Sequence, residues 1–144
     1  MIEMLIVFVV FAAVVTISIR SVGDTLRRDR VAKVAAILGT DVEQAFALAA
    51  RQRVPIRMKI APRILRFTIE DRSDSTVKYR TRWFNSGDLS LDFIATNDTI
   101  IDIMPSGLST DTLNLTLGIY TKGGAQYTKS VRATIAGLVR LDNR

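Results

Sequence analysis

The chain has 144 residues, which is enough for one modest globular domain and too few for a multidomain enzyme. It contains no Cys and no His, so thiol chemistry, disulfides and the commonest general base are excluded. Twenty Lys and Arg residues against fourteen Asp and Glu residues give a net charge of +6, which favours acidic partners such as nucleic acid or anionic lipid and is equally typical of a solvated basic surface.

The first 19 residues form a nearly unbroken apolar stretch, MIEMLIVFVVFAAVVTISI. Its length approaches the roughly 20 residues that a membrane-spanning helix needs, so residues 1–19 are predicted to form a transmembrane or filament-core helix. Two alternatives are a cleaved signal peptide and a helix buried in a soluble core. The first fits poorly because no Lys or Arg precedes the apolar run. The second fits poorly because so short a chain has little material to cover a uniformly apolar helix.

Glu3 is the one charged residue within this apolar stretch. A carboxylate inside hydrocarbon costs roughly 2.5 to 3.5 kcal/mol, so such a residue is a candidate functional site. The alternative is a glutamate exposed among lipid headgroups near the end of the helix.

An amphipathic pattern follows over residues 20–53. Its apolar residues recur at spacings of mostly three and four, which is typical of one helical stripe: Val22, Leu26, Val31, Val34, Leu38, Val42, Phe46 and Ala49. Charged residues, Asp41 among them, fall largely off this stripe. Pro55 disfavours helix at the residue before it. The pattern therefore predicts one helix from about Met1 to Arg53, roughly 80 Å long at 1.5 Å per residue.

Residues 55–144 change to a period of two, which indicates short antiparallel strands with one buried face. The predicted strands cover 56–60, 65–69, 77–82, 89–93, 97–104, 113–119, 127–135 and 138–141, with a hairpin turn at Gly123-Gly124. The predicted fold class is α+β: a long N-terminal helix packed on a C-terminal antiparallel β-sheet domain.

Several segments resemble motifs of one protein family. Residues 1–7, MIEMLIV, look like the start of a mature pilin-type helix, with Glu3 in the place of the family's near-terminal glutamate. Residues 45–56, 105–108 and 137–140 are similar to the family's helix end, Pro-x-Gly turn and closing Gly-Arg-x-Arg strand. On these residues the chain resembles the GspH/FimT family of minor pseudopilins and minor type IV pilins over almost its whole length. It departs from the family at residues 46–48, where Phe-Ala-Leu replaces the usual Arg-Ser-Glu, and at Leu138, which replaces the first Arg of the closing strand.

The resemblance implies a structural subunit of a type II secretion pseudopilus or a type IV pilus, at or near the filament tip. It implies other minor and major pseudopilins or pilins and an inner-membrane assembly platform as partners. It also implies a single-pass anchor in the bacterial inner membrane, with the C-terminal domain in the periplasm. The positive-inside rule points the other way, because Arg20 and the basic residues after it follow the apolar stretch. Glu3 would pair with the terminal ammonium of a neighbouring subunit and fix the axial register.

Two alternatives belong to other classes: a DNA-binding minor pilin in DNA uptake, and a signal-anchored periplasmic β-domain that enters no filament. For DNA, the strand alternation places Arg80 and Arg82 on one outward sheet face together with Arg57, Lys59, Arg66 and Lys78. Some FimT-like proteins bind DNA through a basic C-terminal strand, which adds Arg132, Arg140 and Arg144 as candidates. Such a surface would bind phosphate in a salt-dependent, sequence-independent way.

Enzymatic activity is not predicted, because the chain has no nucleophile elbow and no phosphate-binding loop. No cofactor is expected. Asp88, Asp92, Asp98, Asp102 and Asp111 do not match the spacing of a calcium loop, so they are interpreted as turn and strand-face residues, and no metal site is predicted.

Overall fold

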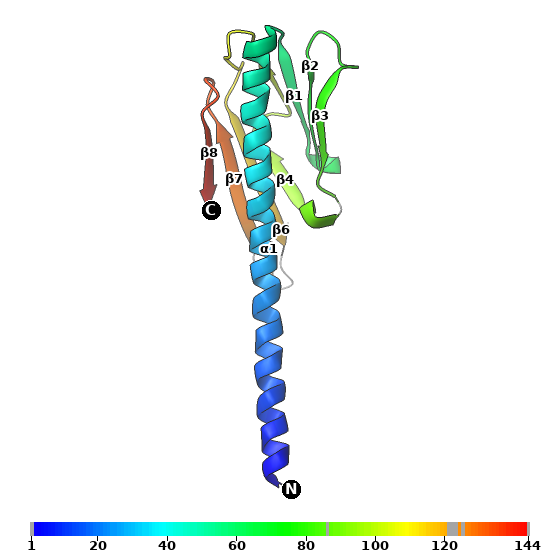
Figure 1. The fold of residues 1–144 in the computed structure, drawn as a ribbon, viewed down its shortest axis with the longest axis vertical. Helices are drawn as coiled ribbons and strands as arrows, with labels where there is room; N and C mark the ends of the chain where they lie inside the picture. Colours follow the sequence, from blue (N-terminus) through cyan, green and yellow to red (C-terminus); the bar gives the residue numbers. More distant parts are fainter. Residues whose placement is uncertain (1, 86, 121–123, 125, 144) are drawn as a thin grey trace.

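The structure is a computed structural model that describes residues 2–85, 87–120, 124 and 126–143. A single helix, α1 (Ile2–Gln52), spans 51 residues, or about 75 Å. Its N-terminal half stands free, and its C-terminal half lies against two β-sheets (Figure 1). The predicted long helix on a β-domain is therefore confirmed.

The end of α1 follows from local backbone chemistry. Arg53 adopts φ of 56°, the left-handed conformation that commonly terminates a helix. Pro55 then disfavours further helix at Val54. The predicted end at Arg53 is thus correct to within one residue.

The first sheet has the strand order β3-β2-β1-β5 and is antiparallel throughout. Its strands are β1 (Ile56–Ala61), β2 (Arg66–Asp71), β3 (Lys78–Trp83) and β5 (Ile100–Ile103). A short 3-10 turn, η1 (Pro62–Ile64), joins β1 to β2. As predicted, Ile56, Met58 and Ile60 face the core from β1.

The second sheet has the order β4-β6-β7-β8 and is also antiparallel. Its strands are β4 (Phe93–Thr96), β6 (Leu113–Tyr120), β7 (Gln126–Ala133) and β8 (Val139–Asn143). Leu115 and Val131 are paired in register and buried, so this side of the sheet packs toward α1. The outer side carries the alternate residues of each strand.

The core lies between the C-terminal half of α1 and the inner faces of both sheets. The helix contributes its apolar stripe from Val31 to Ala49, and the sheets contribute side chains such as Phe67 and Leu117. The turn before β8 closes over Phe46: Gly137 has φ of +81°, and a Cβ there would lie 2.8 Å from the Phe46 ring. A glycine is therefore required at this turn for both its backbone conformation and its close packing.

Some predicted elements differ from the structure. The strand predicted over 89–93 is wrong, because Leu89 ends a 3-10 turn, η2 (Gly87–Leu89), and β4 begins only at Phe93. Leu91 is nevertheless buried, and its N–H donates to the Phe84 carbonyl at 2.7 Å. The apolar alternation over residues 89–93 therefore arises from a turn that packs on the core and not from a strand. The predicted hairpin turn includes Gly123, which lies outside the described residues.

Candidate functional site

The N-terminal half of α1 exposes a continuous apolar surface. Ten large apolar side chains between Ile2 and Val15 are exposed, and those of Ile2 and Phe8 are 77% and 68% accessible. The β-domain does not reach this part of the helix (Figure 1). Val22 and Leu26, which the sequence places on the same stripe as the core residues, are exposed for the same reason. Exposed apolar patches of this extent mark an interaction surface.

Glu3 lies in the first turn of α1 and is exposed. Its carboxylate is favourably placed there, because the helix dipole concentrates partial positive charge at the N-terminus. Within the described residues no ion pair involves Glu3, so its predicted partner on a neighbouring subunit stays a prediction. In the part of the chain that the structure describes, no helix combines the length and hydropathy needed to cross a bilayer. The predicted membrane anchor also stays a prediction.

Arg80 and Arg82 do not lie on the outer face of the first sheet, and this part of the sequence interpretation is wrong. Both side chains point toward α1, where they bind Asp41. The register explains the error: Arg82 pairs with Phe67 and Arg80 with Ile69, which are core-facing residues of β2. A β-bulge at Ile69/Glu70 then shifts the phase of β3, so that alternation cannot be extended through it.

Asp41 is 2% exposed and accepts a bidentate contact from Arg82, with Nε at 2.8 Å and Nη2 at 3.2 Å. The Nη1 of Arg80 lies 3.5 Å from the same carboxylate. The hydrogen bond to Asp41 raises the pKa of Arg82 above its usual value, and burial opposes that shift. A buried charge is tolerated only when it is paired in this way, so the cluster ties β3 to α1.

Asp41 was not among the residues predicted from the sequence to form a site. Its helical position flanks the apolar stripe, one residue before the buried Val42 and three after the buried Leu38. Flank positions of this kind lie within reach of a sheet that covers the stripe. An acidic residue at such a flank, together with two arginines on a later strand, was the sequence signal that could have predicted this ion-pair cluster.

On the outer face of the first sheet, two of the remaining basic residues, Arg57 and Lys59, are paired with carboxylates. Arg57 makes a bidentate contact with Asp102, at 2.7 and 2.9 Å, and Arg72 approaches the same carboxylate at 3.1 Å. Lys59 forms an ion pair with Glu70, and Arg66 stacks over Trp83 at 5.2 Å. The predicted single positive surface of six residues is therefore divided between two faces, and four of its residues, Arg57, Lys59, Arg80 and Arg82, contact carboxylates.

Asp102 is the centre of this outer network. The hydrogen bonds from Arg57 hold the pKa of its carboxyl below the usual range, although burial acts in the opposite direction. The same hydrogen bonds raise the pKa of Arg57. Both groups therefore stay charged at neutral pH and stabilise the pairing of β1 with β5.

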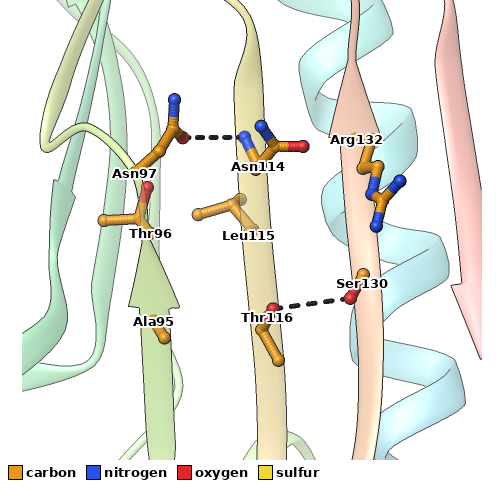
Figure 2. Close-up of a pocket in the computed structure, with 8 residues that line it drawn as sticks. All are labelled: Ala95, Thr96, Asn97, Asn114, Leu115, Thr116, Ser130 and Arg132. Atoms are coloured by element: carbon orange, nitrogen blue, oxygen red, sulfur yellow. Dashed lines mark hydrogen bonds between the residues drawn. The ribbon is translucent and has the colours of Figure 1, made fainter. Parts of the chain in front are cut away.

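A polar groove of about 410 Å³ lies on the outer face of the second sheet (Figure 2). Its floor is made of small side chains on three adjacent strands, Ala95, Thr116 and Ser130. Thr116 and Ser130 approach each other at 3.4 Å through their hydroxyl groups. At one end, the Asn97 side chain accepts a hydrogen bond from the Asn114 backbone N–H at 2.9 Å. Small floor residues leave the groove open to solvent.

One of the predicted nucleic-acid residues, Arg132, lines this groove, and a second, Arg140, lies on the neighbouring strand. Arg132 on β7 is paired in register with Arg140 on β8, and both are exposed. Asp142 lies 3.6 Å from Arg132 and offsets part of this charge. Arg144 lies outside the described residues. Like charges directly opposite on a sheet are unfavourable, so an anion at this position would relieve repulsion.

Within the described residues, no group of three or more acidic side chains is placed to hold a metal ion.

Comparison with solved structures shows the fold. The type IV minor pilin FimU of Pseudomonas aeruginosa (strain PAO1) matches with a TM-score of 0.62 and 13% identity, over 80% of this chain and 90% of that one. The minor pseudopilin EpsH from the type 2 secretion system of Vibrio cholerae matches with a TM-score of 0.55 and 14% identity, over 79% and 97%. The chain therefore has the fold of these two proteins, a minor pilin and a minor pseudopilin. No protein-family model and no curated protein matches the sequence.

Proposed function

We propose that this chain is a minor pseudopilin or minor pilin of the GspH/FimT type. It would serve as a structural subunit of a type II secretion pseudopilus or a type IV pilus, at or near the filament tip. The observation that carries the proposal is the apolar surface of α1 between Ile2 and Val15, which the chain's own β-domain leaves uncovered. The partners would be other pilin-type subunits, whose helices would cover this surface, and an inner-membrane assembly platform.

Energetics support a helix-bundle contact. Fully burying one large apolar side chain contributes about 1.5–3 kcal/mol. Relative to exposure in water, burial of half of the ten exposed side chains between Ile2 and Val15 would thus contribute on the order of 10 kcal/mol. A helix that leaves the bilayer for a filament keeps this contribution only if neighbouring helices replace the lipid, because transfer between two apolar environments costs little.

Within this proposal Glu3 sets the register of the helices. A carboxylate in an apolar bundle is costly unless it is paired, and the terminal ammonium of a neighbouring subunit would pair with it at only one axial position. A station in the bacterial inner membrane before assembly, with the β-domain in the periplasm, is part of the same proposal and rests on the sequence of residues 1–19.

The test compares two glutamates of the same helix. Glu3→Gln should reduce incorporation into filaments at least about tenfold, since the loss of a desolvated ion pair costs a few kcal/mol. Glu43→Gln is the matched control, because Glu43 is exposed beside the β-domain and should not affect incorporation. Immunoblots of sheared filaments against total cell protein would measure the ratio. Wild-type incorporation of Glu3→Gln would refute the register role, whereas absence of the wild-type chain from sheared filaments would favour an anchored β-domain outside any filament.

A second candidate function is DNA binding in an uptake pilus, and the Arg132–Arg140 pair is the observation that favours it. Binding would be steeply salt-dependent because phosphate contacts release counterions. Fluorescence anisotropy of labelled duplex DNA with the full chain in detergent micelles tests it. The Arg132→Ala, Arg140→Ala double variant should weaken binding, whereas an Arg53→Ala, Arg63→Ala control of equal charge should weaken it less. No binding at low salt would exclude this function.

A further inference from the structure

A groove runs along the flank of α1 that the side chains of β3 approach. Three adjoining hollows, of about 270, 50 and 480 Å³, follow the helix from Ala36 to Gln52 and all border on Gln44. Strand β3 is an edge strand of its sheet, and its Tyr79, Arg80 and Arg82 line the two smaller hollows together with α1. Among the described residues, the largest hollow is lined by α1 alone.

The groove has an apolar floor and a basic rim. Leu48 and Tyr79 are partly buried and line its centre. Arg51, Arg80 and Arg82 line its length, and Asp41 is the one acidic side chain among its described lining residues. Because Asp41 is buried and bound by two arginines, it presents no free carboxylate to a partner.

Arg80 retains capacity for a further contact. Arg82 takes both oxygens of Asp41 at 2.8 and 3.2 Å, whereas Arg80 lies at the longer distance of 3.5 Å and donates through Nη2 to Gln44 at 3.2 Å. The Arg80 side chain is 40% exposed. A guanidinium has five N–H donors, so Arg80 can bind a second carboxylate without releasing the first.

We propose that the α1–β3 groove is a docking site for an acidic segment of a neighbouring filament subunit, with carboxylates on Arg80 and Arg51 and an apolar side chain over Leu48 and Tyr79. Charge complementarity selects an acidic occupant, because three arginines face one neutralised carboxylate. The groove lies on the C-terminal half of α1, the same helix whose N-terminal half is the proposed packing surface. This inference rests on the proposed function: a neighbour packed along α1 necessarily lies beside one of its flanks.

The experiment exploits the absence of cysteine from the chain. A photoactivatable crosslinker is attached to Ala47→Cys, which lies in the groove, and filaments are irradiated in the cells that assemble them. Ala50→Cys is the matched control, since it is an exposed alanine rotated about 60° around the helix from Ala47 and does not line the groove. We expect Ala47→Cys to crosslink a pilin-type subunit through an acidic peptide, identified by mass spectrometry, with little product from Ala50→Cys.

Charge variants test the chemistry of the site. Arg80→Gln in the Ala47→Cys chain should lower the crosslink yield about fivefold, the effect of losing one partly exposed ion pair. Arg63→Gln, an exposed arginine in η1, should leave the yield unchanged. The thermal unfolding of Arg80→Gln would be checked in parallel, because the Arg82–Asp41 contact should keep the domain folded.

The outcomes separate this inference from the proposed function. Equal crosslinking from Ala47→Cys and Ala50→Cys, a crosslink to a segment without acidic residues, or an unchanged yield for a folded Arg80→Gln would overturn the groove assignment. If Ala12→Cys, within the exposed apolar half, still crosslinks to neighbouring pilin-type helices, the proposed function stands without it. Loss of both crosslinks would overturn both.

Discussion

The two halves of α1 differ in what covers them. Val31, Val34 and Leu38 are at most 1% exposed, because both sheets lie against this part of the helix. Val7, Phe8 and Phe11 are 64–68% exposed, although they belong to the same continuous helix. Apolar residues are thus core where the β-domain reaches them and free surface where it does not. The surface that the chain itself leaves open is the one we assign to assembly.

The largest expected effect comes from placing a charge in each half. Val34→Asp buries an unpaired carboxylate in the core and should destabilise the domain by more than about 4 kcal/mol. Phe8→Asp lies outside the domain and should leave its unfolding within about 0.5 kcal/mol of wild type while abolishing filament incorporation. Circular dichroism melts in detergent and filament immunoblots would measure the two quantities. Domain unfolding by Phe8→Asp would contradict the division of the helix.

The next effect concerns the tie between the buried half and β3. Arg82→Ala leaves Asp41 buried with only the longer contact to Arg80 and should cost about 3 kcal/mol. Arg66→Ala removes a stacking contact with the half-exposed Trp83 and should cost about 1 kcal/mol or less. Urea unfolding monitored by the fluorescence of the single tryptophan would resolve the difference in wild type and Arg82→Ala, and circular dichroism would serve for Arg66→Ala. Equal costs would mean that Asp41 is not held by Arg82 as described.

Acid should lower the free energy of unfolding of the β-domain and the C-terminal half of α1, and it should not affect the helix in the exposed N-terminal half. The pKa of Asp102 is lowered in the folded state, so its contribution is present above the ordinary carboxyl pKa of about 3.9 and is lost as pH falls through the lowered value. Asp102→Asn should cost about 1–2 kcal/mol at pH 7 and flatten the decline between pH 4 and pH 2. Melting temperatures over this pH range would show it. Parallel curves for both proteins would exclude Asp102 as the cause.

The smallest expected effect on stability comes from replacing one glycine by alanine in each half of α1. Gly39→Ala should raise the free energy of unfolding of the domain by up to about 1 kcal/mol, because alanine favours helix and its Cβ would meet Val139 and Leu141 at an ordinary 3.5 Å. Gly23→Ala meets nothing within 4 Å and should slow local amide exchange without raising the domain's melting temperature. An equal rise in melting temperature for both would show that the two halves unfold as one unit.

Periodicity predicted those parts of the fold in which local pattern and packing agree. The helix end at Arg53 followed from Pro55, and the core face of β1 followed from the alternation of Ile56, Met58 and Ile60. Patterns failed where tertiary contacts set the outcome. Leu91 is buried from a turn, and the inward arginines of β3 follow from a bulge and a buried carboxylate 39 to 41 residues away in sequence.

The candidate sites were predictable to different degrees. Hydropathy alone marked the apolar half of α1 and Glu3, because that surface depends on no tertiary contact. The adjacency of Arg132 and Arg140 required the register of β7 and β8, although both residues had been named from a resemblance. The α1–β3 groove was not predictable, because it depends on how the side chains of an edge strand lie against the helix.

Crosslinking from Ala12→Cys tests the central claim most directly, since this residue lies within the apolar half and the chain has no other cysteine. The chain would be expressed with its filament-forming partners, irradiated with a short photoactivatable crosslinker, and its products identified by mass spectrometry. We expect a dominant crosslink to the N-terminal helix of a pilin-type subunit. Crosslinks to lipid alone, with no subunit product, would show that the exposed half of α1 does not pack in a filament.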